Sequence, residues 1–394
     1  MALTIGVPRE TFPGERRVAL VPRTCEALAK LGAGVIVEQS AGAEAGFPDD
    51  QYVARGARIG SRSDAFQADI VVQVRSLGAN PEAGRADLAT LRPGQTLIGF
   101  GEPLTALQED ADLARTGVSF FAMELMPRIT RAQSMDALSS MATIAGYKAV
   151  LLAATTLPKI FPMLMTAAGT ITPARVLVLG AGVAGLQAIA TSRRLGAIVY
   201  AYDVRSAVKE QIESLGAKFV VLDIETGQSE DKGGYAKAMD EEFYRRQREL
   251  LKEVIREQDV VISTAAVPGK KAPILITADM ASALAPGSVI VDVAAERGGN
   301  CELTKPGETV VHQGISILGP LNLASSAPFH ASQMYASNVA SFLKLMLAKD
   351  GTLNINRDDE IIRETLVTFG NEVVHPRVAE LLGLSPTAPA AGGR

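Results

Sequence analysis

The sequence has no tryptophan, only two cysteines and only three histidines among its 394 residues. Cys25 and Cys301 are too few and too distant to form a disulfide framework or a metal site, which favours a reducing compartment and no bound metal. Nothing in the sequence pairs His312, His330 or His375 with an orienting acid. We therefore expect structural or surface roles for all three histidines.

Long apolar runs and an excess of basic residues are also missing. The net charge of −4 gives no reason to expect a nucleic-acid partner. The first twenty residues lack the basic-then-apolar order of a secretion signal. The least polar region, 149–173, is interrupted by Pro158, Lys159 and Pro162, and no stretch reaches the ~20 apolar residues of a membrane span. We expect a soluble chain without direct membrane insertion, which can still work at a membrane through a partner.

Residues 175–203, RVLVLGAGVAGLQAIATSRRLGAIVYAYD, form the most informative segment. An apolar strand over 175–179 leads into Gly180-x-Gly182-x-x-Gly185, then a helical segment and a second strand over 197–202. In this pattern the first glycine permits a tight turn, the second lets the backbone approach a pyrophosphate, and the third lets helix and strand pack closely. The segment therefore predicts a complete dinucleotide-binding βαβ unit rather than an isolated glycine pattern.

Asp203 ends the second strand, at the distance where such units place an acid against the adenosine ribose. Its charge would repel a 2′-phosphate and favours NAD over NADP, although Arg205 follows closely. The alternative is a glycine turn that binds nothing. The cofactor-binding residues predicted here are Gly180, Ala181, Gly182, Val183, Gly185, Asp203, Val204 and Arg205.

The length favours two domains, and strand-like and helix-like segments alternate through most of the chain. We expect an α/β fold with two Rossmann-like, doubly wound parallel-sheet domains and a cleft between them. Residues 1–140 and 321–394 are assigned to the first domain, residues 141–320 to the nucleotide-binding domain, and 141–155 to a linking helix. The weakly periodic segment 227–240 is a candidate mobile loop, and helices are expected over 332–347 and near 357–367.

The segment MELMPRITRAQSMDALSS, residues 123–140, gathers polar groups without an evident structural role. Arg128, paired with Asp136, could hold a phosphate or a carboxamide, and Gln133 could both donate and accept hydrogen bonds. The alternative is a solvated loop in which Asp136 or Ser139 caps the following helix. The residues alone do not decide between the two.

The chain closely resembles the NAD(H)-binding component, domain I or the alpha subunit, of proton-translocating NAD(P) transhydrogenases. The resemblance extends from GVPRE at 6–10 to about residue 376. Its most specific motifs, besides the glycine turn, are MELMPRITRAQSMD at 123–136, MTAAGT at 165–170, GGYAKAM at 233–239, VPGKKAP at 267–273 and GGNCELTKPG at 298–307.

The resemblance implies roles for individual residues. Arg128, Gln133 and Asp136 match a loop that touches the nicotinamide end of NAD(H), where Gln133 helps to bring two nicotinamides together. Asp203 matches the acid that binds the adenosine ribose, and Tyr235 matches the tip of a mobile loop. The other positions assigned to the nucleotide site are Ile129, Ser134, Ser139, Ala181–Val183, Gly234, Gln247 and Ala266.

The resemblance also implies a reaction: direct, Si-Re specific hydride transfer from NADH on this chain to NADP⁺ on a partner subunit, coupled to proton translocation by a membrane subunit. Such a transfer needs alignment of two rings rather than an acid or base, which agrees with the scarcity of histidines. A homodimer is implied, together with NADP-binding and membrane-spanning partner subunits. The implied location is the cytoplasm, at the cytoplasmic face of the inner membrane.

Two alternatives remain at this point. Alanine dehydrogenase shares the GVPRE opening, and Arg17 matches an arginine of that family. However, Arg75 stands at its lysine position, and 97–103 contains no histidine at its histidine position. An NAD-sensing protein on the same fold is the second alternative, because a fold does not determine a function.

Overall fold

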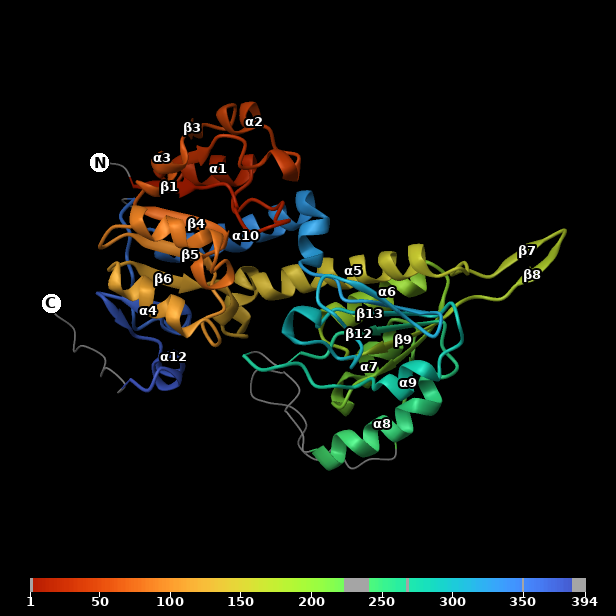
Figure 1. Ribbon diagram of the computed structural model, residues 1–394. Coiled ribbons are helices and arrows are strands. Elements are labelled where there is room, and N and C mark those ends of the chain that lie inside the picture. The colour runs from red at the N-terminus through yellow and green to blue at the C-terminus, as the bar shows by residue number, and fades with distance from the viewer. Residues whose placement is uncertain (1–2, 223–240, 267–268, 349–350, 385–394) are drawn as a thin grey trace. The chain divides into compact units, whose positions relative to one another are not determined.

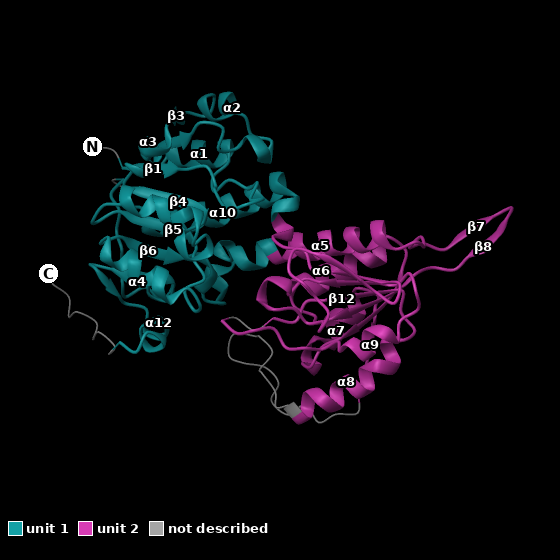
Figure 2. Ribbon diagram, viewed as in Figure 1, with its two compact units in different colours: residues 1–141, 325–394 teal, residues 142–324 magenta. Residues whose placement is uncertain are grey.

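The computed structural model describes residues 3–222, 241–266, 269–348 and 351–384 (Figure 1). The chain forms two compact units, residues 1–141 with 325–394 (unit 1) and residues 142–324 (unit 2) (Figure 2). The candidate mobile loop 227–240 and the tail beyond residue 384 lie outside the described residues.

Unit 2 holds a seven-stranded sheet in the order β11-β10-β9-β12-β13-β15-β14, parallel except for β14. The chain order reverses between β9 and β12, and α/β sheets bind ligands beyond the carboxyl ends of strands at such a switch point. The strands are β9 (Arg175–Leu179), β10 (Ile198–Tyr202), β11 (Lys218–Phe219), β12 (Val260–Ser263), β13 (Val289–Asp292), β14 (Thr309–His312) and β15 (Ile315–Leu318).

Helices cover both faces of this sheet (Figure 1). Ala153, Ile189 and Ile212 pack on one face, whereas Leu251 and Met280 pack on the other. The central strands are therefore buried on both sides, which explains their nearly continuous apolar sequences. The helices are α5 (Ala137–Thr156), α6 (Val183–Arg194) and α7 (Lys209–Ser214) on the first face, and α8 (Glu241–Ile255) and α9 (Ala278–Ser282) on the second.

Unit 1 repeats the same winding in an eight-stranded sheet, ordered β17-β16-β6-β5-β4-β1-β2-β3. The strands from β3 to β6 are parallel, and β16 and β17 continue the sheet antiparallel. The α/β class with two parallel-sheet domains is thus confirmed. The strands are β1 (Thr4–Val7), β2 (Gly34–Glu38), β3 (Arg58–Gly60), β4 (Ile70–Arg75), β5 (Thr96–Phe100), β6 (Ser119–Ala122), β16 (Leu366–Phe369) and β17 (Glu372–Val373).

Alternating side chains of β6 anchor the two helical layers of unit 1. Phe120 packs in the cluster that contains Leu113 of α4, whereas the ring of Phe121 meets Phe342 of α10 edge to face, with ring centroids 5.4 Å apart. The helices of this unit are α1 (Pro22–Ala29), α2 (Asp49–Val53), α3 (Arg62–Phe66), α4 (Leu107–Arg115), α10 (Pro328–Met346), α11 (Glu360–Thr365) and α12 (Pro376–Leu381).

The segment near 357–367 corrects a sequence prediction. Only residues Glu360–Thr365 are helical, and β16 begins at the next residue, Leu366. Leu366, Val367 and Thr368 are buried where β16 pairs with β6. Pairing at the sheet edge overrides the helical spacing of the sequence, because strand preference depends mainly on neighbours and burial.

Helix α5 starts at Ala137, earlier than predicted, and is the one helix of the described residues that is long and apolar enough to cross a membrane. The sequence pattern alone indicates no such stretch. Small residues such as Ala142, Ala145 and Ala149 make this helix apolar without making it bulky. Ala149, Val150 and Ala153 are buried in the core of unit 2, as in the core helix of a globular domain.

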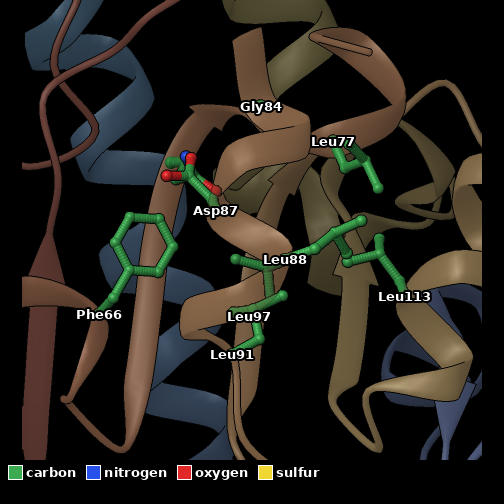
Figure 3. A pocket seen from close by; sticks show the side chains of 9 residues that line it. Phe66, Leu77, Gly84, Asp87, Leu88, Leu91, Leu97 and Leu113 are labelled. Carbon is green, nitrogen blue, oxygen red and sulfur yellow. The ribbon is translucent and has the colours of Figure 1, made fainter. Parts of the chain in front are cut away.

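Unit 1 also encloses a cavity of about 10 Å³ between α3, β5 and α4, with leucine side chains along much of its wall (Figure 3). A cavity of this size holds about one water molecule. Asp87, paired with Arg62 at 2.6 Å, lies at its polar side. The cavity is thus part of the core packing and too small for an organic ligand.

Asp110 of α4 is fully buried, and among the described residues neither of its carboxylate oxygens has a hydrogen-bond partner. Burial, and then the charges of Glu124 and Glu109, raise its pKa to about 8. Between about pH 4 and pH 8 the folded chain keeps a proton that the unfolded chain loses, so stability falls as the pH rises. We expect Asp110→Asn to reduce this fall by up to about 1.4 kcal/mol per pH unit, measured by urea unfolding across that range.

Asp112 on the same helix is the matched control. Although burial opposes the shift, hydrogen bonds from Arg85 and Gln108 lower the pKa of Asp112. Its contribution is therefore lost only as the pH falls through that lowered value, and Asp112→Asn should leave the descent towards pH 8 unchanged. Equal slopes for wild type and Asp110→Asn would show that Asp110 is ionised in the folded chain at neutral pH.

Candidate functional site

The glycine turn after β9 has no room for side chains at two of its three glycines. Gly180 has φ +94°, and a Cβ there would lie 2.8 Å from Thr264 Oγ1. A Cβ on Gly185 would lie 1.9 Å from the carbonyl oxygen of Gly180. The turn and the first turn of α6 are therefore in direct backbone contact, as the sequence pattern predicts.

Gly182 differs from the other two glycines. It is the N-cap of α6 with φ −75° and ψ −170°, and a Cβ there would meet no atom within 4 Å. Open space therefore lies beside the backbone at the start of a twelve-residue helix. The unpaired N–H groups and the positive dipole end of a helix N-terminus favour a phosphate at such a place.

Asp203 connects the end of β10 to this turn. Its carboxylate is 7% exposed and accepts a hydrogen bond of 2.7 Å from the backbone N–H of Ala181. Arg205 donates to both oxygens, with its Nε at 2.9 Å and its Nη2 at 2.8 Å. Val204, between them, is partly buried against the α8–α9 side of the sheet. The acid thus lies under the glycine turn, with a guanidinium over its remaining lone pairs.

The other predicted residues of unit 2 have different surroundings. Gln247 of α8 is fully buried and donates to the Tyr202 hydroxyl at 2.9 Å. Ala266 is exposed, shortly after the end of β12. Gly234 and Tyr235 lie outside the described residues.

Two further residues at the carboxyl edge of this sheet are not among the site residues that the sequence predicts. Asp292 ends β13, and Asn300 follows in the loop; both are fully buried. Asn300 forms hydrogen bonds with the backbone of Ala265, directly after Thr264. An aspartate at the end of an apolar strand is visible in the sequence, but only the fold shows that Asn300 reaches the end of β12.

The predicted loop of unit 1 is held by contacts of its own. Residues Thr130–Met135 form a short 3₁₀ helix in which Ala132 and Met135 are buried. The Asn338 side chain of α10 donates to the Ser134 carbonyl at 2.9 Å. Arg131 forms a two-pronged pair with Asp359 at 2.6 and 2.9 Å, which lowers the pKa of Asp359. The loop is therefore a fixed platform rather than a free surface segment.

Asp136 caps helix α5. Its two carboxylate oxygens accept hydrogen bonds from the backbone N–H of Ser139 at 2.8 Å and from its hydroxyl at 2.6 Å. Of the remaining predicted residues of this loop, Arg128, Gln133 and Ser134 are exposed, and Ile129 is half-buried. Unit 1 thus brings Arg128, Gln133 and Ser134 together on the open side of a rigid loop, while Asp136 and Ser139 stabilise the helix that follows.

The positions compared with alanine dehydrogenase lie in a buried ion-pair cluster of unit 1. Arg17 donates to both oxygens of Glu15 at 2.7 and 2.6 Å, and Arg75 donates to the same carboxylate at 3.1 Å. The Arg75 guanidinium also lies 4.2 Å from the centre of the Phe12 ring. Both cations therefore interact with an acid of the chain itself.

None of the three histidines is placed for proton transfer at the glycine turn within its unit. His312 lies 3.0 Å from the Ser282 hydroxyl, and His330 packs against the ring of Phe329. Burial, and then the charge of Arg377, lower the pKa of His375 to about 4. His375 is therefore neutral at physiological pH.

Comparison with known proteins assigns the chain to a family. Residues 6–145 match the model of the alanine dehydrogenase/PNT N-terminal domain, and residues 149–376 match that of the alanine dehydrogenase/PNT C-terminal domain. The chain belongs to the alanine dehydrogenase/PNT family.

Within the alanine dehydrogenase/PNT family, the chain is 47% identical over 379 residues to an NAD(P) transhydrogenase alpha subunit of Rhodospirillum rubrum, covering 95% of this chain and 98% of that protein. A solved transhydrogenase structure from Sinorhizobium meliloti is 41% identical, with a TM-score of 0.82 and coverage of 95% and 99%. An alanine dehydrogenase of Halomonas elongata is 30% identical, with 97% of each chain covered. The resemblance to transhydrogenase alpha subunits is thus confirmed, and alanine dehydrogenase is a more distant relative.

Proposed function

We propose that the chain is the NAD(H)-binding subunit of a proton-translocating NAD(P) transhydrogenase. One observation carries the proposal. An intact glycine turn, with Asp203 bonded under it, occurs in a chain 47% identical over nearly its whole length to a transhydrogenase alpha subunit. NADH bound here supplies a hydride to NADP⁺ on a partner subunit.

Unit 2 contributes the binding of the dinucleotide in this proposal. The backbone beside Gly182 and the N-terminus of α6 suit the pyrophosphate, because a helix N-terminus offers unpaired donors. Asp203 suits the ribose hydroxyls once these compete with Arg205 for its oxygens. A 2′-phosphate would meet the Asp203 carboxylate, and this repulsion supports a preference for NAD over NADP.

Unit 1 contributes the loop that orients the nicotinamide. We assign Arg128, Gln133 and Asp136 to this task, with Ile129, Ser134 and Ser139 beside them. The buried side of the loop and the Asp136 cap hold its backbone, so that an exposed Gln133 can align two rings without moving. No proton acceptor is required for transfer between two nicotinamides, which fits the surroundings of the three histidines.

The proposal includes a homodimer, an NADP-binding subunit and a membrane subunit that couples the reaction to proton translocation. The chain would then lie in the cytoplasm, at the cytoplasmic face of the inner membrane, through these partners. The hairpin of β7 (Leu164–Thr166) and β8 (Gly169–Ile171) supports self-association. It projects from unit 2 with Met165 79% and Ile171 46% exposed (Figure 1), and isolated two-stranded hairpins are marginally stable in water.

If the hairpin packs on a second copy, charge on its apolar side chains should separate the dimer. We expect Met165→Asp combined with Ile171→Asp to shift the purified chain from dimer to monomer in analytical ultracentrifugation, because two carboxylates would be buried in an apolar interface. Val53→Asp, at a 57% exposed site of α2, is the matched control and should stay dimeric. A monomeric wild type, or a dimeric double variant, would contradict this assignment.

The proposed activity is tested by mixing the purified chain with a purified NADP-binding partner and following hydride transfer in a stopped-flow instrument. We expect NADH binding by the chain alone and transfer only in the mixture. Alanine-dependent NADH formation by the chain alone would instead indicate an amino-acid dehydrogenase. NADH binding without transfer in any mixture would indicate a sensor.

A further inference from the structure

The Asn300 side chain joins two distant points of the chain. Its Oδ1 accepts a hydrogen bond from the Ala265 N–H at 3.0 Å. Its Nδ2 donates to the Ala265 carbonyl and to the Pro273 carbonyl, both at 2.8 Å. Asn300 is fully buried, and these three bonds use both amide hydrogens and the amide oxygen.

Asp292 fixes Asn300 from the other side. This buried carboxylate accepts hydrogen bonds from the N–H of Asn300 at 2.7 Å, from the N–H of Cys301 at 2.9 Å and from the Thr304 hydroxyl at 2.7 Å. Asp292 is itself the last residue of β13. The position of Asn300 is therefore determined by the neighbouring strand and not by loop packing alone.

The same arrangement continues to the glycine turn. Thr264, which precedes Ala265, donates from its hydroxyl to the Gly180 carbonyl at 3.1 Å. Asp292, Asn300, Ala265, Thr264 and Gly180 thus form one connected path along the carboxyl edge of β13, β12 and β9. In this fold the two halves of a dinucleotide bind on either side of the switch point, one half at the first βαβ unit and the other at the next strands.

We propose that Asn300 is a positioning residue for the nicotinamide half of the bound dinucleotide. The inference rests on the proposed function, because it requires a dinucleotide at the glycine turn. By holding both backbone groups of Ala265, Asn300 sets the surface at the end of β12 that the nicotinamide half meets. The adenosine half depends instead on Gly182 and Asp203.

Two substitutions test this role. Asn300→Asp keeps the shape of the side chain but turns an oxygen towards carbonyls that need a donor, and Asn300→Ser removes the bridge. We expect either variant to weaken NADH binding about tenfold or more, since at least one buried hydrogen bond is lost or left unpaired. Binding of AMP, which lacks the nicotinamide half, should change by no more than about twofold.

Gln258 provides the matched control. It is 3% exposed, lies in the same unit just before β12, and donates from its side chain to the Val254 carbonyl. Gln258→Glu therefore replaces a buried amide by a carboxyl group at the opposite edge of the sheet. We expect a loss of stability for this variant without a change in the ratio of NADH to AMP affinity.

The measurement is a titration of each purified full-length variant with NADH and with AMP, together with hydrogen exchange of the Ala265 amide. Faster exchange with a selective loss of NADH affinity supports the role. Equal losses of NADH and AMP affinity, or unchanged NADH affinity in both Asn300 variants, would overturn it. Absence of NADH binding by the wild type would instead refute the proposed function, which separates the two failures.

Discussion

Replacing Gly182 with alanine should weaken NADH binding at least about a hundredfold, because a methyl group would stand where the backbone approaches the pyrophosphate. The folded chain itself has room for this methyl group, since a Cβ there meets no atom within 4 Å and φ is −75°. The free energy of unfolding should fall by no more than about 1 kcal/mol, the usual cost of alanine at an N-cap. NADH fluorescence titration and urea unfolding measure the two quantities.

Gly185→Ala is the matched comparison, three residues further along the same turn. Its Cβ would lie 1.9 Å from the Gly180 carbonyl oxygen, a backbone atom that cannot move without displacing α6. We expect a loss of about 3 kcal/mol in the free energy of unfolding, together with the loss of binding. Gly182→Ala with wild-type NADH affinity would show that the dinucleotide does not approach the chain at this turn.

The strands around both switch points could be predicted because they are buried on two sides. β1, β5, β9 and β15 have the bounds that the sequence patterns indicate. Such strands read as short apolar runs that end in glycine, proline or a polar residue, so a single sequence identifies them.

The edge strands could not be predicted in the same way. β14 alternates exposed and half-buried residues, and β16 directly follows a helix. The β7–β8 hairpin has exposed side chains throughout. The position of such strands depends on the neighbour with which they pair, and a sequence without its fold does not contain that neighbour.

The candidate site shows the same division. The turn from Gly180 to Gly185 and Asp203 follow from local spacing, because all the contacts lie within one βαβ unit. Arg131 stands among the candidate residues by sequence, yet it pairs with Asp359, 228 positions away. Asn300 acts through the backbone of Ala265 and Pro273, 35 and 27 positions away, and no local pattern indicates such bonds.

The second large effect is expected at Gln133, where shortening the side chain by one methylene should slow hydride transfer more than it weakens NADH binding. Gln133→Asn keeps the amide but withdraws it from the exposed side of the loop. The loop backbone should not move, because Ala132 and Met135 remain buried and Asn338 still holds the Ser134 carbonyl. Small errors in alignment reduce the rate of an oriented reaction by up to about a hundredfold.

Single-turnover transfer with a purified NADP-binding partner gives the rate, and a titration with NADH gives the affinity. We expect a loss of about ten- to a hundredfold in rate, with the dissociation constant for NADH within about threefold of wild type. Gln108→Asn, an exposed glutamine of α4 in the same unit, is the control and should alter neither. Equal losses in rate and affinity would make Gln133 a binding group only, because an interaction made equally before and during transfer weakens binding without a separate effect on the reaction step.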